Sequence, residues 1–136
     1  MTWVVDTCLI IDVLENDPAF AVASAKLIDK LSPEGLTICP VSYVELAPAF
    51  LGDMRRQDEF LTAIGIDSTE LWDRQATQSA HQAWARQIGL RRERKALRRP
   101  VADILIGAFA AGRKGLLTRN PRDFKFVFPE LKIVNP

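Results

Sequence analysis

Short apolar runs rich in β-branched and aromatic residues alternate with helix-like segments along the whole chain. The strand-like runs cover residues 2–5, 36–39, 65–67, 115–118 and 131–134. Strands that alternate with helices, rather than with tight turns, build a parallel sheet covered by helices on both faces. The sequence therefore predicts an α/β fold of three layers, α/β/α, around a central parallel sheet of about five strands.

The intervening segments carry helical periodicity. Apolar spacing predicts helices over residues 19–31, 55–64 and 101–112, and a short helix that starts at Pro40, because proline is tolerated in a first helical turn. Residues 70–99 form a long polar helical region that we expect to break near Gly89. Asn120-Pro121-Arg122-Asp123 has the composition of a turn.

The size of the chain fits one domain over residues 1–136, and 48% hydrophobic residues are enough for a core without disulfides. The net charge of +1 means that any nucleic-acid-binding surface has to be local. No apolar run approaches the roughly 18 residues of a membrane span. The N-terminus enters a strand-like run without an export signal, so we expect a cytoplasmic protein without a membrane partner.

Few residues are available for zinc or nucleophilic chemistry. Cys8 and Cys39 are far apart and belong to no His/Cys cluster, which argues against a zinc site. The single histidine, His81, lies in a polar helical stretch with no nucleophile motif nearby, so a Ser-His-Asp triad is not supported. We interpret His81 as a surface residue.

Acidic and amide side chains instead follow the predicted strands. The candidates are Asp6 after the first strand, Glu45 in the helix after the second, Asp103 in the apolar helix 101–112, and Asn120 and Asp123 after the fourth strand. In parallel sheets ligands bind outside the carboxyl ends of the strands. These side chains are therefore expected at one edge of the sheet.

Each candidate also has a structural interpretation. Asp6 or Thr7 can serve as a plain helix N-cap, and Ser42-Tyr43-Val44-Glu45 matches a capping box. Asp103 can sit in a first helical turn, where the dipole stabilises it by roughly 0.3–1 kcal/mol. Asp123 can cap a turn. The sequence leaves these alternatives open residue by residue.

The joint pattern favours a metal site. Clustered carboxylates raise one another's pKa, and a divalent cation removes that conflict. Oxygen ligands without histidine or cysteine suit Mg2+ or Mn2+. We therefore expect Mg2+ (or Mn2+) as cofactor.

Four blocks in this order and spacing resemble the PIN-domain family, and specifically the VapC-type toxin ribonucleases of type II toxin–antitoxin systems. The blocks, which together span nearly the whole chain, are Val-Val-Asp-Thr at 4–7, Val-Ser-Tyr-Val-Glu-Leu at 41–46, Val-Ala-Asp-Ile-Leu-Ile-Gly-Ala at 101–108 and Leu-Thr-Arg-Asn-Pro-Arg-Asp-Phe at 117–124. The resemblance implies a PIN-like fold and metal-dependent cleavage of RNA phosphodiester bonds.

The resemblance also implies roles for particular residues. Catalytic and metal-binding roles fall to Asp6, Glu45 and Asp103, and the family's fourth acid matches Asn120 or Asp123. Asn120 stands where many relatives carry Asp, so Asp123 is the alternative fourth ligand. Thr7 and Thr118 are expected to support the site as hydroxyl residues.

The basic stretch and the family resemblance indicate which partners to expect. Arg91, Arg92, Arg98 and Arg99 lie in a basic stretch just before Asp103, which is either a solvated face or a track for RNA phosphates. The resemblance implies a VapB-type antitoxin and a homodimer. Trp3, Trp72, Trp84 and residues 47–50 belong either to an interface or to the core.

The predicted function is thus a metal-dependent endoribonuclease toxin inhibited by a cognate antitoxin. One alternative is a catalytically weak PIN module that mainly binds RNA or protein, which Asn120 favours. A phospho-receiver domain fits less well, because Asp6 has no adjacent acid and no lysine follows the last strand.

Overall fold

Five parallel strands form one sheet in the order β3-β2-β1-β4-β5. The computed structural model describes the backbone of residues 1–92 and 100–136, and the side chains of residues 1–89 and 100–136. The strands are β1 (Trp3–Val5), β2 (Leu36–Thr37), β3 (Ile66–Asp67), β4 (Gly115–Leu117) and β5 (Ile133–Val134). The predicted α/β class with a central parallel sheet of five strands is confirmed.

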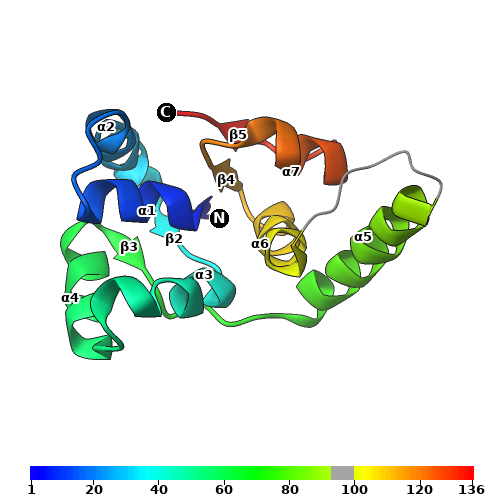
Figure 1. Cartoon of the computed structure of the whole chain (residues 1–136), viewed down its shortest axis with the longest axis horizontal. Coiled ribbons are helices and arrows are strands. Elements are labelled where there is room, and N and C mark those ends of the chain that lie inside the picture. The colour runs from blue at the N-terminus through cyan, green and yellow to red at the C-terminus, as the bar shows by residue number, and fades with distance from the viewer. Residues whose placement is uncertain (93–99) are drawn as a thin grey trace.

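Helices connect the strands and surround the sheet (Figure 1). They are α1 (Thr7–Leu14), α2 (Ala21–Leu31), α3 (Pro40–Glu45), α4 (Met54–Ala63), α5 (Arg74–Arg92), α6 (Val101–Ala111) and α7 (Pro121–Val127), with short 3-10 turns η1 (Ser32–Glu34) and η2 (Ala47–Phe50). Within residues 1–92 and 100–136, no helix combines the length and the hydropathy that crossing a membrane requires.

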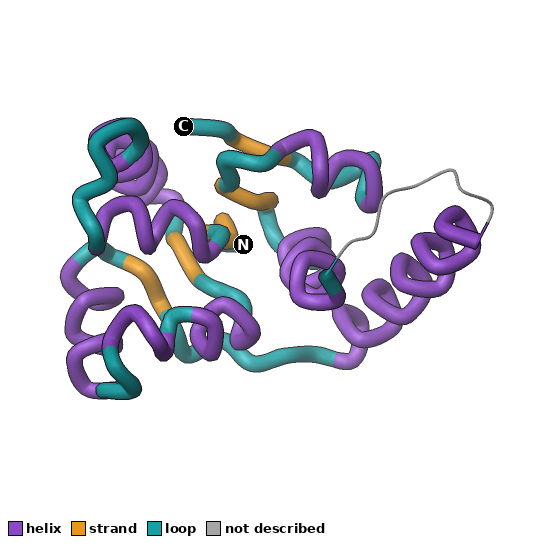
Figure 2. Tube along the Cα trace, in the orientation of Figure 1, coloured by secondary structure: helices purple, strands orange, loops and turns teal. Residues whose placement is uncertain are grey.

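Alternate residues of the central strands belong to two separate cores. Trp3 and Val5 of β1 pack with apolar residues of α1, α2 and α4, whereas Val4 packs with α5, α6 and α7. Successive side chains of a strand point to opposite faces, so helices must cover both faces of this sheet. Figure 2 shows the strands lying between the helices.

The order of the strands sets the place where a ligand can bind. The chain runs from β1 outward through β2 to β3, and then returns to the other side of β1 with β4 and β5. This reversal makes the junction of β1 and β4 the switch point of the sheet, where a crevice opens beyond the carboxyl ends. Asp6 follows β1 and Thr118 follows β4, so both residues lie at that junction.

Two local predictions were wrong. Residues 120–123 are the start of α7, not an isolated turn: proline occupies the first helical position, and Phe124 and Val127 bury one face. Helix α5 continues through Gly89, because a single glycine in a helix costs only about 1 kcal/mol. The three tryptophans divide between roles: Trp3 is buried in the core, whereas Trp72 and Trp84 are partly exposed beside it.

Gly107 and Gly89 form a matched pair for testing the packing. A Cβ on Gly107 would lie 2.4 Å from Cε2 of the buried Phe128 ring, whereas a Cβ on Gly89 meets nothing within 4 Å. We expect Gly107→Ala to lower the free energy of unfolding by about 1–3 kcal/mol through overpacking. Gly89→Ala should raise it by about 0.5–1 kcal/mol through helix propensity. Urea denaturation checks both, and equal midpoints would contradict the packing described here.

Candidate active site

Asp6 is the most deeply buried of the predicted site residues that carry a carboxylate. The backbone N–H of Asp6 donates to the carbonyl oxygen of Leu117 at 2.9 Å, so the exits of β1 and β4 are fixed side by side. Only 7% of Asp6 is exposed. Its position is therefore set by the sheet itself.

One hydroxyl and one thiol contact the Asp6 carboxylate. Thr118 Oγ1 donates to Oδ2 at 2.7 Å, and the Cys8 thiol approaches the same oxygen at 3.4 Å. Thr118 Oγ1 also accepts from the backbone N–H of Asn120 at 3.1 Å. Asp6 stands at the N-cap of α1, but its side chain makes no capping hydrogen bond. The plain N-cap interpretation therefore does not account for this carboxylate.

Burial raises the pKa of both Asp6 and Cys8. Removal from water raises the pKa of Asp6 above its usual range, while the hydrogen bonds from Thr118 and Cys8 and the charge of Arg119 oppose that rise. Burial and the neighbouring Asp6 carboxylate raise the pKa of Cys8 to about 11. At neutral pH Cys8 is thus a thiol donor to Asp6 and not a nucleophilic thiolate.

Glu45 reaches the same edge of the sheet from α3. Thr7 Oγ1, in the first turn of α1, donates to Glu45 Oε1 at 2.8 Å, and this bond joins the segments that follow β1 and β2. The predicted capping box does not form, because α3 begins at Pro40 and Glu45 is its last residue. Glu45 is exposed and can change rotamer without disturbing the core.

The Ser42 hydroxyl, one turn before Glu45, is fully buried. Among the described residues it is the one buried side-chain polar atom without a hydrogen-bond partner. Buried polar groups are nearly always satisfied, so an unpaired oxygen in this helix is unusual.

The remaining candidates occupy first helical turns. Asp103 lies in the first turn of α6 and Asp123 in the first turn of α7; both are half-buried, and both have further interactions with other residues. Asn120 is the exposed N-cap residue of α7 and makes no side-chain cap. Helix α6 packs against both β1 and α3, the helix that carries Glu45.

The described side chains nonetheless do not form a closed metal cage. In residues 1–89 and 100–136, no three His, Cys, Asp or Glu side chains gather closely enough to hold an ion. The chemistry of the donors fits a hard divalent cation, since the carboxylates of Asp6 and Glu45 are accompanied by hydroxyls and by a thiol that stays protonated.

The arginines of the predicted RNA track lie outside the residues whose side chains are described. Arg91 and Arg92 belong to the last turn of α5, where the backbone alone is described, and Arg98 and Arg99 lie outside the described residues. His81 is exposed, as the sequence predicts.

An ion pair beside the site was missed by the sequence analysis. Asp12, which the sequence analysis does not select as a candidate, is only 3% exposed and accepts two hydrogen bonds from Arg119, at 2.7 and 3.0 Å. A signal was present: Asp12 interrupts the apolar run Leu-Ile-Ile-Asp-Val-Leu at 9–14. An acid flanked by apolar residues in a helix needs a partner when the helix is buried.

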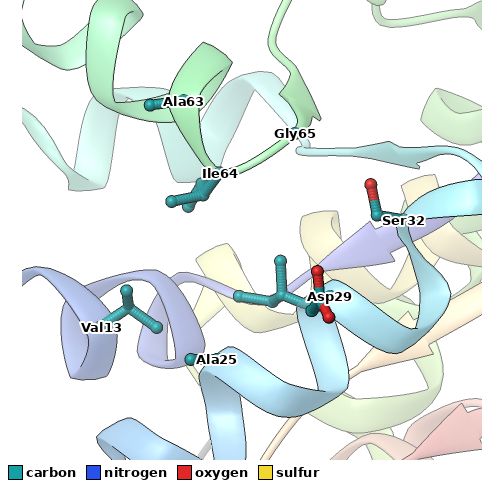
Figure 3. A pocket seen from close by; sticks show the side chains of 8 residues that line it. Val13, Ala25, Asp29, Ser32, Ala63, Ile64 and Gly65 are labelled. Atoms are coloured by element: carbon teal, nitrogen blue, oxygen red, sulfur yellow. The ribbon is translucent and has the colours of Figure 1, made fainter.

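A hollow of about 310 Å³ lies elsewhere, between α1, α2 and α4 (Figure 3). Its lining includes Ser32 and Gly65, which precede β2 and β3, so it opens at the amino ends of the strands. It contains none of the predicted site residues. This hollow thus lies at the opposite edge of the sheet from the acidic residues, whereas a larger hollow of about 740 Å³ lies at the carboxyl edge, between α3 and the segment that follows β3.

Comparison with solved structures identifies the fold. The chain superposes on one chain of the crystal structure of VapBC2 from Rickettsia felis bound to a DNA fragment from their promoter, with a TM-score of 0.73 and 18% sequence identity, covering 99% of this chain and 98% of that chain. The two chains share one fold. The PIN-like architecture expected from the sequence is thereby confirmed along nearly the whole chain. No protein-family model and no curated protein matches the sequence.

The burial of Asp6 predicts how the thermal stability of the protein depends on pH. Because burial raises the pKa of Asp6, the ionised form destabilises the fold at pH 7.5, and protonation relieves this as the pH falls through that pKa. We expect Asp6→Asn to melt at a higher temperature than the wild type in EDTA at pH 7.5, with the difference shrinking on acidification. Equal melting temperatures at every pH would refute the burial argument.

Proposed function

We propose that this protein is a VapC-type PIN-domain endoribonuclease that cleaves RNA phosphodiester bonds with Mg2+ or Mn2+. The observation that carries the proposal is the buried Asp6 carboxylate at the β1–β4 switch point, oriented by the Thr118 hydroxyl at 2.7 Å. A desolvated carboxylate with no cation of its own directly bonded is costly. A divalent ion at that position removes the cost.

In this proposal Asp6, Glu45 and Asp103 hold the ion, with Asn120 or Asp123 as a further ligand. When bound, the ion supplies a more acidic water and neutralises charge on the scissile phosphate. Thr118 holds Asp6 in one orientation, and Thr7 holds Glu45 close to the same edge. The exposed Glu45 side chain completes the site by turning toward the ion.

Cleavage should depend on these carboxylates and on the metal. We expect Asp6→Ala, Asp103→Ala and added EDTA each to reduce cleavage of total RNA below detection, because each removes the ion or its fixed ligand. Asp29→Asn is the matched control, since Asp29 is an exposed acid at the amino edge of the sheet. Full cleavage in EDTA would reject the proposal. Sequencing the new RNA ends after expression in a bacterial host identifies the target.

The basic stretch before Asp103 is proposed to bind RNA phosphates. Replacing Arg91 and Arg92 together with alanine should weaken binding of an RNA oligonucleotide, measured by fluorescence anisotropy with the catalytically inactive Asp6→Ala protein. Each lost phosphate contact should lower the slope of log affinity against log salt by about one unit. An unchanged slope would show that these arginines face solvent.

Partners are also proposed. The likeness to the VapBC2 structure supports a VapB-type antitoxin as inhibitor. A homodimer is proposed from the family resemblance alone, and light scattering of the purified chain measures it. Trp3 and Phe50 are buried in the core of the single chain and are not available to a second copy.

A second candidate is a PIN module with weak catalysis that mainly binds RNA or protein. The absence of three metal-holding groups among the described side chains favours it, as does Asn120 in place of an acid. A Mn2+ titration by calorimetry separates the two: a ribonuclease site binds the ion, and Asn120→Asp should tighten binding. A degenerate site binds Mn2+ weakly in both proteins.

A further inference from the structure

Arg119 joins three parts of the molecule through its side chain. It leaves the end of β4 between Thr118 and Asn120, and its guanidinium binds both oxygens of Asp12 on α1. The guanidinium carbon also lies 4.1 Å from the centre of the Phe20 ring, at the start of α2. A planar fork of donors on a carboxylate fixes direction as well as distance.

The acceptor side of this ion pair is rigid. Asp12 is 3% exposed, and Ser24 Oγ of α2 donates to its Oδ2 at 3.0 Å, the oxygen that also binds Arg119 Nε. Asp12 therefore has little freedom to follow Arg119. The ion pair ties the loop after β4 to two helices that are themselves packed in the core.

The residues on either side of Arg119 hold the site together. Thr118 Oγ1 donates to Asp6 and accepts from the N–H of Asn120. The backbone N–H of Arg119 lies close enough to Cys8 to lower the pKa of its thiol. A shift of this three-residue loop would move the donor of Asp6 and the start of α7 together.

We propose that Arg119, anchored by Asp12, is a positioning residue that holds Thr118 against Asp6. Its guanidinium is bonded to Asp12, so we propose that it acts by holding the loop in place and not by contact with substrate. The catalytic consequence rests on the proposed ribonuclease function, whereas the positioning itself is a property of the metal-free chain.

Amide hydrogen exchange of the metal-free full chain tests the positioning. In Asp12→Asn, we expect the amides of Asp6 and Asn120 to exchange at least about tenfold faster relative to the amide of Lys114, because the loop opens locally. The Lys114 amide is bonded to Thr2 at the other end of β4. A role that is only structural would accelerate all three amides alike.

Glu70→Gln is the matched control. It breaks the partly buried ion pair of Arg113 and Glu70, which lies at the amino end of β4. The amides of Asp6 and Asn120 should exchange at their wild-type rates in this variant, even if the Lys114 amide, which lies beside the broken ion pair, exchanges faster. Arg119→Lys keeps the charge but loses the bidentate hydrogen bond to Asp12, so it should reproduce the effect of Asp12→Asn. If Asp12→Asn does not fold, Arg119→Lys is measured in its place.

Kinetics give an independent readout. Asp12→Asn should lower kcat for RNA cleavage by about 10- to 100-fold at unchanged KM, as expected for a misplaced ligand. Once Thr118→Val has removed the hydroxyl, adding Asp12→Asn should cost little more, whereas Thr118→Ser should retain activity. Additive losses in the double variant would overturn the proposal.

The outcomes separate the two proposals. If the wild type cleaves no RNA, the exchange rates still decide whether Arg119 positions the loop. If the wild type cleaves RNA and the amides of Asp6 and Asn120 stay protected in Asp12→Asn and Arg119→Lys, the positioning proposal is wrong and the ribonuclease proposal stands.

Discussion

The pairing of β1 with β4 is the contact on which the candidate site depends. Asp6 and Thr118 are 112 residues apart in sequence, yet the parallel register places Val5 opposite Leu117, so the next residue of each strand meets the other. The resulting hydrogen bond stabilises the ionised Asp6 carboxylate, which burial destabilises. Every other element of the site is arranged around this pair.

Strand β2, which lies on the other side of β1, brings a second carboxylate to the same edge of the sheet. Because β2 lies on the other side of β1, the helix after β2 starts at the same edge, and Thr7 can reach Glu45. Two hydrogen bonds, Thr118 to Asp6 and Thr7 to Glu45, thus link the segments that follow the adjacent strands β4, β1 and β2. This arrangement places both carboxylates at the carboxyl edge of the sheet, each bonded to a threonine hydroxyl.

Two edges of the sheet carry different features. The carboxyl edge holds the acids, the hydroxyls and the Asp12–Arg119 ion pair, whereas the amino edge holds the hollow between α1, α2 and α4. Asp12 is buried and Arg119 is partly exposed, so the ion pair anchors the loop after β4 to α1.

Sequence alone determined the architecture and the candidate acids, because strand composition, helical periodicity and the position of acids after strands are local properties. It could not determine that α7 replaces a turn, since the two-turn helix is stabilised by burial of Phe124 and Val127. Nor could it reveal that Asp12 is buried against Arg119, a pair 107 residues apart. Whether Asp6 caps its helix or faces Thr118 was likewise decided only by the tertiary structure, because both choices satisfy the same short sequence and only the neighbouring strand supplies the competing hydroxyl.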